Sequence, residues 1–343
     1  MVEMASGEAM ATWLPIIWIG LLGAAVALYV VLDGFDLGIG ILFPFSPEEQ
    51  DRDVMMNSVA PFWDGNETWL ILGGGGLFVA FPMAYGIIMS GFYLPVIIML
   101  LALVFRGVAF EYRWVSKPNH RWWDIAFAGG SITAAFMQGI ILGGLLHGLP
   151  VKDGHFAGGM LDWLQPFPLF VGFATVAGYA LLGTTWLIMR TEGEVAAQAR
   201  EQAPKLLLAV LAAMTIVSLW TPLSEPRIWD RWFTLPNLFY LAPIPLLTAL
   251  AAFTVWRGLA NHHDNAPFFG TVALFLLGFA GLAISTLPYL VPPTITIWDA
   301  AAAPSSQLFM LIGTVALLPM ILGYTAFVYW TFRGKVKPGE GYH

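Results

Sequence analysis

Two acidic residues in an otherwise apolar stretch are the most informative feature of the chain. Asp64 and Glu67 belong to the segment 57–78, which has the composition of a membrane helix. Because they are three residues apart, they lie on one face of that helix. An ionised carboxylate in the bilayer core costs about 2.5–3.5 kcal/mol on insertion scales. Such costly groups predict that protons or ions pass along this helix.

Further charged residues occur in two neighbouring apolar stretches. Asp33 and Asp36 lie in VLDGFDLGIG, and Arg106 and Glu111 lie in VFRGVAFEYR. Burial disfavours the charged form of a carboxyl, so such groups can exchange protons near neutral pH. The charges gather in the first third of the chain, and this concentration predicts a proton path from the cytoplasm to the middle of the bilayer.

Three interpretations of these residues compete. In the first interpretation they form a proton path. In the second they form a structural ion-pair network, where Arg106 neutralises one aspartate and the other acids are protonated. The acids would form such a network in a scaffold that only stabilises a partner. In the third, a transporter or proton channel acts alone, because carboxylates near the midplane also occur there. That transporter would need a matching site in the second half of the chain, where charge is scarce.

The composition places the whole chain in the membrane. Of its 343 residues 58% are hydrophobic and 11% are charged, whereas about 25% are charged in soluble domains. With ~20 residues per membrane span, the length leaves no room for a soluble domain. The net charge of −7 argues against a nucleic-acid partner. The absence of cysteine excludes disulfides, Cys-ligated metals and iron–sulfur clusters.

Apolar stretches separated by Pro, Gly and charged clusters predict an all-α polytopic membrane protein of about nine helices. We expect one transmembrane domain over residues 1–343. Trp and Tyr gather near the ends of the stretches, as interface anchors do. The predicted helices cover residues 13–43, 54–81, 84–110, 122–147, 166–190, 203–223, 236–257, 267–290 and 305–332.

The basic residues predict the orientation. Only Lys152, Arg227 and Arg231 fall on one side of the predicted helices, and most of the others fall on the opposite side. Cytoplasmic loops carry the excess of positive charge, so the N-terminus is predicted to be periplasmic and the C-terminus cytoplasmic. The predicted cytoplasmic residues are Arg52, Arg113, Lys117, Arg121, Arg190, Arg200, Lys205, Arg257, Arg333, Lys335 and Lys337.

With this orientation, each charged residue has a predicted depth at ~1.5 Å per residue. The first and third helices would run inward and the second outward. The predicted order from the cytoplasm is Glu111, then Asp36, Asp33 and Arg106, and finally Asp64 and Glu67. We therefore expect the last two acids near mid-membrane.

Other residues predict packing or exclude cofactors. The pairs Gly34/Gly38 and Gly139/Gly143 have the spacing that lets helices pack closely. All six histidines lie in predicted loops or at helix ends, and the methionines are scattered. Haem in a helix bundle needs a His or Met pair at suitable depth. We therefore expect this chain to ligate neither haem nor metal by itself.

Several segments resemble subunit II of the cytochrome bd-type quinol oxidases, including the cyanide-insensitive branch. The segment around Asp64 is the most specific, and the resemblance covers essentially the whole chain. It implies nine helices, arranged as two four-helix bundles and one peripheral helix, in the bacterial inner membrane. The matching segments are DGFDLGIG (33–40), NSVAPFWDGNETWL (57–70), SGFYLPVIIMLLALVFRGVAFEYR (90–113), the WDAAAAPSSQL region (298–308) and YTAFVYW (324–330).

The resemblance also implies a partner and its chemistry. Subunit I would hold two haems b and a haem d, bind most of the quinol, and reduce oxygen to water without pumping. Protons would arrive from the cytoplasm through a channel shared by both subunits, with Asp64 and Glu111 on it. The sequence leaves open whether a small single-helix accessory subunit or a structural quinone is bound. We expect membrane lipid around the chain.

Each charged residue then has an expected role. Glu111 would accept protons from the cytoplasm, and Asp64 with Glu67 would pass them toward the partner's haem. Asp36 and Arg106 would set the field around the path. The expected proton path comprises Asp64, Glu111, Glu67, Asp36 and Asp33, and its electrostatic and structural partners are Arg106 and Trp63.

Three positions depart from some relatives of that family. A histidine can stand at the position of Phe62, a neutral amide at that of Glu67, and an aspartate at that of Glu111. The first difference removes an imidazole that could relay protons. The second adds an acid one turn from Asp64. The order of the relay steps is therefore left open.

Overall fold

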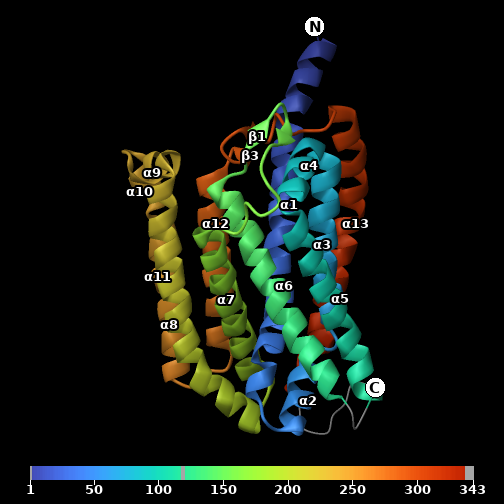
Figure 1. Cartoon of the computed structure of the whole chain (residues 1–343), viewed down its shortest axis with the longest axis vertical. Helices are drawn as coiled ribbons and strands as arrows, with labels where there is room; N and C mark the ends of the chain where they lie inside the picture. Colours follow the sequence, from blue (N-terminus) through green and yellow to red (C-terminus); the bar gives the residue numbers. More distant parts are fainter. Residues whose placement is uncertain (1, 117–119, 337–343) are drawn as a thin grey trace.

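The chain folds into a bundle of long helices, in a computed structural model that describes residues 2–116 and 120–336, with side chains from residue 10 (Figure 1). Lys117 and Lys337, expected on the cytoplasmic side, lie outside the described residues, as does His343. Eight helical stretches in the described part are long and apolar enough to cross a membrane. They are α1 (Val2–Leu42), α5 (Tyr93–Val115), α6 (Arg121–His147), α7 (Pro166–Arg190), α8 (Gly193–Ser224), α10 with α11 (Asn237–Leu241 and Pro243–Ala260), α12 (Asn265–Thr286) and α13 (Pro304–Thr331).

Shorter elements connect these helices. Figure 1 shows two small hairpins at the end of the bundle where α1 begins, called here the hairpin end, whereas α2 lies at the opposite end, the α2 end. Val151 pairs with Phe156 in the first hairpin, and Tyr289 pairs with Thr296 in the second. The shorter elements are η1 (Phe43–Phe45), α2 (Glu49–Asn57), α3 (Trp63–Ala80), α4 (Pro82–Gly91), β1 (Val151–Lys152), β2 (His155–Phe156), α9 (Pro226–Phe233), β3 (Tyr289–Val291) and β4 (Ile295–Thr296).

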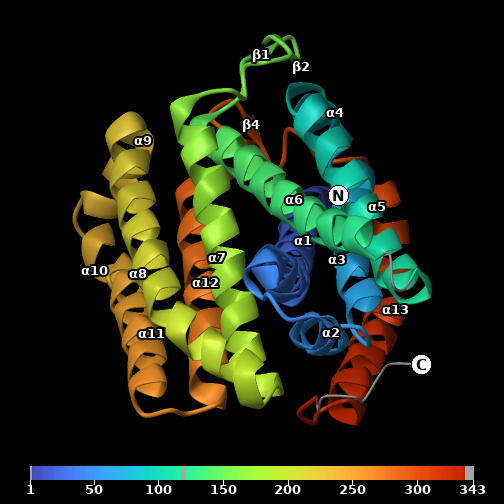
Figure 2. The same cartoon turned by 60° about the horizontal axis from the view of Figure 1, so that its bottom comes forward.

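The helices form two groups that meet along α1 and α7. Figure 2 shows α1, α3, α5 and α6 on one side, and α7, α8, α11 and α12 on the other. α13 lies outside the first group. At the hairpin end, Gln307 of α13 donates a hydrogen bond to the Ala80 carbonyl, and its own carbonyl accepts one from Trp18. α13 therefore lies against both α1 and α3.

Glycines allow the central helices to approach closely. A Cβ on Gly38 would lie 1.9 Å from the carbonyl oxygen of Tyr179, and one on Gly34 would lie 2.9 Å from the Tyr179 ring. A Cβ on Gly139 or Gly143 would lie 2.6 or 2.8 Å from backbone atoms of α7. Both predicted glycine pairs are thus confirmed as places where helices pack without room for a side chain.

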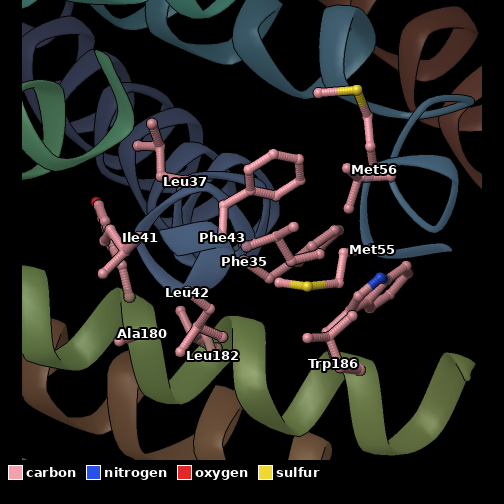
Figure 3. Close-up of a cluster of buried hydrophobic side chains, with 14 of the residues drawn as sticks. Phe35, Leu37, Ile41, Leu42, Phe43, Met55, Met56, Ala180, Leu182 and Trp186 are labelled. Carbon is pink, nitrogen blue, oxygen red and sulfur yellow. The ribbon is translucent and has the colours of Figure 1, made fainter. Parts of the chain in front are cut away.

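A cluster of buried apolar side chains fills the α2 end between the two groups. Figure 3 shows Phe35 of α1, Met55 of α2 and Trp186 of α7 meeting there. The rings of Phe35 and Trp186 are stacked, with centroids 4.0 Å apart and planes 10° from parallel. This packing fixes α1 relative to α7 one residue before Asp36.

Two predicted helices are interrupted. The predicted helix 54–81 was wrong as a continuous element, because α2 ends at Asn57, residues 58–62 form turns, and α3 begins at Trp63. Pro61 lies in these turns, where its ring and missing N–H disfavour a continuous helix. The predicted helix 84–110 is likewise divided at Phe92 between α4 and α5.

Two further boundaries differ. The helix predicted at 203–223 begins ten positions earlier, at Gly193, because the polar stretch that precedes the apolar one is also helical. The helix predicted at 236–257 is a short α10 followed by α11, which ends at Ala260.

Candidate functional site

A fully buried arginine joins α1, α3 and α5. Arg106 of α5 places Nη1 2.7 Å from Asp33 Oδ1 of α1, and Nη2 3.2 Å from Glu67 Oε2 of α3. The side chains of Arg106 and Asp33 are 0% exposed, and that of Glu67 is 28% exposed. One guanidinium therefore serves two carboxylates, of which only Glu67 reaches the surface of the chain.

Asp36 lies one turn beyond Asp33 on α1 and is also completely buried. Its Oδ2 accepts a hydrogen bond of 2.8 Å from Asn66 Nδ2, which also donates to the carbonyl of Leu32 at 3.2 Å. The hydroxyl of Tyr329 on α13 donates to Asn66 Oδ1 at 2.9 Å. The hydrogen bond to Asp36 thus comes from the neutral amide of Asn66, which also links α13 to α1.

Trp63 and Asp64 begin α3 but have different surroundings. The ring of Trp63 stacks on Phe110, with centroids 4.8 Å apart and planes 4° from parallel. A Cβ on Gly107 would lie 3.3 Å from the Trp63 ring, so α3 and α5 are closely packed here. Asp64 is exposed on the outer side of α3 and interacts electrostatically with Glu67.

Glu111 is exposed on α5 and lies apart from the buried group. The structure therefore brings together Asp33, Asp36, Glu67 and Arg106, with Trp63 and Asp64 beside them.

The predicted depths need a correction. Glu67 was expected to lie deeper in the membrane than Arg106, but the two side chains are in contact. The reason is the interruption at 58–62, which places Asp64 and Glu67 in the first two turns of α3.

A buried polar string, unexpected from the sequence, leads from Asp33 into the second group of helices. Tyr29 lies one turn before Asp33 on α1 and interacts with it electrostatically. Gln138 Nε2 of α6 donates to the Tyr29 hydroxyl at 2.7 Å, and the Tyr179 hydroxyl of α7 donates to Gln138 Oε1 at 2.7 Å. Gln138, an amide within an apolar helix, was the signal that could have revealed this string.

A second buried arginine, whose burial was not predicted, lies two turns further along α5. Arg113 was predicted as one of the cytoplasmic basic residues, yet its side chain is 0% exposed. Its Nη1 lies 2.5 Å from Asp53 of α2, and its Nε lies 2.6 Å from Asp124 of α6. Arg52 also pairs with Asp124, at 3.4 Å. This network joins α2, α5 and α6 at the α2 end.

A third group of charges holds the segment after α13 against the second group of helices. Lys335 Nζ lies 2.8 Å from Asp264 Oδ2 in the loop between α11 and α12, and Arg200 pairs with the other oxygen of Asp264. The Val336 amide donates to the Arg190 carbonyl at 2.8 Å. The hydrogen bond from Lys335 is the largest cause that lowers the pKa of Asp264 below its usual range.

Comparison with known proteins places this arrangement in a family. The model of the family "Cytochrome bd terminal oxidase subunit II" matches residues 14–332. The chain belongs to that family. The chain is 32% identical over 369 residues to cytochrome bd-I ubiquinol oxidase subunit 2 of Escherichia coli K12, covering 94% of this chain and 95% of the relative. It is 30% identical over 340 residues to cytochrome bd ubiquinol oxidase subunit 2 of Bacillus subtilis, covering 94% and 97%.

The fold of a solved bd oxidase agrees with this membership. The bd oxidase structure from Geobacillus thermodenitrificans superimposes with a TM-score of 0.76 and 17% sequence identity, over 94% of this chain and 99% of that chain. Membership makes this subunit II a component of a quinol-oxidising terminal oxidase. It is a multi-pass protein of the bacterial inner membrane, and it forms a complex with subunit I.

The side chains of the described residues decide whether this subunit II could hold a haem, a metal ion or a quinone. They contain no group of three or more His, Cys, Asp or Glu side chains placed to hold a metal ion. His120 lies in the network at the α2 end, 3.6 Å from Glu49, and His147 ends α6. A cavity of about 20 Å³ beside Leu42 and Leu187 and one of about 10 Å³ beside Leu146 and Thr221 have room for water and not for a quinone ring.

Proposed function

We propose that this chain is the haem-free subunit of a cytochrome bd-type oxidase and supplies part of the route by which cytoplasmic protons reach the oxygen-reducing haem of subunit I. The observation that carries the proposal is the contact of Arg106 with Asp33 and Glu67. One guanidinium cannot neutralise both of these carboxylates and Asp36 as well. Since unpaired charge in the bilayer is costly, this group is stable only if it also holds protons.

The proposed route uses the exposed acids as its ends. Glu111 accepts protons from the cytoplasm, and Asp64 with Glu67 passes them toward subunit I. Arg106 and Asp36 set the field around the route. Glu67 suits the transfer because its side chain is partly exposed, whereas the carboxyls of Asp33 and Asp36 are sealed inside the chain.

The outer surface of α3 is the proposed contact with subunit I near this route. The positions that follow Asp64 on the same face, Thr68, Ile71, Gly75 and Phe78, are all exposed. Gly74 and Gly75 have open space where a Cβ would lie, so a helix of the partner could approach closely. An acid at the start of this face would then be covered by subunit I and not by lipid.

The proposed topology has nine crossings, arranged as two four-helix bundles with α13 peripheral. α3 is the ninth crossing in addition to the eight apolar stretches, because it connects the same two ends of the bundle as α1 and α5 (Figure 1). Arg52 and Arg113 lie at the α2 end, while Lys152 lies in the hairpin at the other end. The α2 end is therefore proposed as cytoplasmic and the N-terminus as periplasmic.

The proposed cofactors and ligands are assigned to the partner. Two haems b and a haem d would lie in subunit I, which would also bind most of the quinol. A structural quinone or a single-helix accessory subunit would have to bind on the outer surface of this chain, among lipid. A transporter that acts alone is disfavoured, because the fully buried carboxyls among the described residues, Asp33 and Asp36, both belong to α1.

The variant Asp64→Asn tests the proposal. We expect the complex to assemble with its haems and to consume oxygen from quinol about 100-fold more slowly or worse, in the range that a proton-transfer group contributes. Glu201→Gln is the matched control, because Glu201 is an exposed acid of α8 that pairs with Lys205. Normal turnover of a haem-replete Asp64→Asn complex would refute the route. Loss of haem together with assembly would instead favour a scaffold.

A further inference from the structure

Asn66 of α3 and Tyr329 of α13 take no part in the proposed proton route, yet they form the hydrogen bonds around Asp36. Asn66 Nδ2 donates to Asp36 Oδ2 at 2.8 Å and to the carbonyl of Leu32 at 3.2 Å. The Tyr329 hydroxyl donates to Asn66 Oδ1 at 2.9 Å. Asn66 is 1% exposed and Asp36 is 0% exposed. Both hydrogens of the buried amide are thus engaged, and Asn66 has no donor left for another group.

The Leu32 carbonyl fixes the direction of the Asn66 amide. A carbonyl can only accept hydrogen bonds, so the NH₂ group of Asn66 must face it. A reversed amide would place two acceptor oxygens against each other, whether or not Asp36 carries a proton. Asn66 therefore donates to Asp36 in either protonation state of that carboxyl.

The ring of Tyr329 is held in place by other aromatic side chains. It stacks on Phe62, with centroids 4.5 Å apart and planes 21° from parallel, and it lies edge-on to Trp186 at 6.4 Å. Phe62 and Asn66 are four residues apart at the start of α3, so Tyr329 contacts both on one side of that helix. This packing keeps the Tyr329 hydroxyl at the Asn66 carbonyl, which would be costly to leave buried without a donor.

Asp36 forms no salt bridge among the described residues. The charged and titratable side chains that face it are Asp33 of α1, Glu67 of α3, Arg106 of α5 and Tyr329 of α13. Arg106 is the only cation in this set, and its two terminal nitrogens contact Asp33 and Glu67. An ionised Asp36 would be completely buried with a single neutral donor, and such a charge is unfavourable in the bilayer.

We infer that Asn66 and Tyr329 are positioning residues that fix a protonated Asp36 carboxyl in one orientation, with the Asn66 amide on Oδ2 and the proton on Oδ1. Oδ1 has no hydrogen-bond partner among the described residues, so it is the oxygen at which the proton can be released or taken up. Through Tyr329, α13 thus controls a carboxyl at the centre of a group of helices outside which it lies. The importance of this proton for oxygen reduction rests on the proposed function.

The test is infrared spectroscopy of the whole complex, because a protonated carboxyl has a separate carbonyl band. We expect one such band that Asp36→Asn removes. A hydrogen bond to a carbonyl lowers its stretching frequency, so Asn66→Leu should move this band to higher frequency. Tyr329→Phe should move it in the same direction by less, since the amide is still present but is held less firmly. Tyr324→Phe is the matched control, because Tyr324 is exposed on α13.

A double variant separates positioning from a general loosening of the fold. Tyr329→Phe/Asn66→Leu should have the band of Asn66→Leu alone, because Tyr329 acts through Asn66. Phe62→Leu removes the ring on which Tyr329 stacks, and it replaces Tyr329→Phe if that variant fails to assemble. Aspartate with an isotope label in its carboxyl identifies the band if Asp36→Asn fails to assemble.

Three results would overturn the inference. They are the absence of a band that belongs to Asp36, a band that keeps its frequency in haem-replete Asn66→Leu or Tyr329→Phe, and a larger shift in the double variant than in Asn66→Leu. Because the infrared readout needs no turnover, it can succeed even if Asp64→Asn shows that protons take another route. The failure of this inference and the failure of the proposed function are therefore distinguishable.

Discussion

Arg106 Nη1 lies 2.7 Å from Asp33 Oδ1, and neither side chain is exposed. Asp33 therefore depends on Arg106 for neutralisation, whereas Arg106 also contacts Glu67. Removing one partner of a buried pair costs about 3–5 kcal/mol, because the remaining charge is left uncompensated, whereas removing both costs much less. This contact also fixes α5 against α1.

Replacing the arginine should therefore impair assembly. In Arg106→Gln we expect a marked loss of haem d co-purifying with a tag on this chain. Arg106→Gln/Asp33→Asn should recover part of it. Arg121→Gln is the control, because Arg121 is exposed at the start of α6. Equal haem content in Arg106→Gln and the unaltered complex would show that the buried pair does not stabilise the subunit.

The close approach of α1 and α7 makes a second prediction. A methyl group at Gly38 would lie 1.9 Å from the Tyr179 carbonyl, so Gly38→Ala must push the helices apart. Overpacking of this kind costs about 1–3 kcal/mol. The thermal midpoint of the purified complex should fall, whereas Gly20→Ala, with open space at the same helix, should leave it nearly unchanged. An unchanged midpoint in Gly38→Ala would contradict the observed packing.

Much of the fold follows from the sequence because membrane helices depend on local composition. Long apolar stretches and their basic flanks predicted most of the helices, and glycine spacing predicted where α1, α6 and α7 pack. The interruption between α2 and α3 was missed, although Pro61 marks it, because the apolar stretch continues across it. Hydropathy measures the preference for lipid, and it does not detect a turn that neighbouring helices cover.

The site was predicted in part. The rarity of charge in apolar helices identified Asp33, Asp36, Glu67 and Arg106 one by one. Their pairing could not be predicted, because it depends on which helices are neighbours and on their relative heights. The burial of Arg113 could not be predicted for the same reason, since a basic residue near a helix end looks the same whether lipid headgroups or acids from other helices surround it.

The docking of the segment after α13 should depend on pH. Lys335 lowers the pKa of Asp264, so the stability from this contact is fully present above the usual pKa of aspartate. It is lost as the pH falls through the lowered pKa. Hydrogen exchange of the Val336 amide, corrected for its intrinsic rate, should therefore become faster in acid.

The variant Asp264→Asn isolates this effect. It should lose protection of the Val336 amide near neutral pH and should show little further change in acid. Asp153→Asn, in the hairpin at the other end of the bundle, should behave like the unaltered protein. Protection that is independent of pH in the unaltered protein would show that the Asp264 pair does not hold the segment.

The central claim is that protons for oxygen reduction pass through the group of charges around Arg106. Oxygen consumption by the Glu67→Gln complex tests it most directly, because Arg106 keeps its partner Asp33 and the subunit should still assemble. We expect normal haem content and quinol-driven oxygen consumption slowed about 100-fold or more, with Glu201→Gln unaffected. A haem-replete Glu67→Gln complex that consumes oxygen at the normal rate would contradict the account.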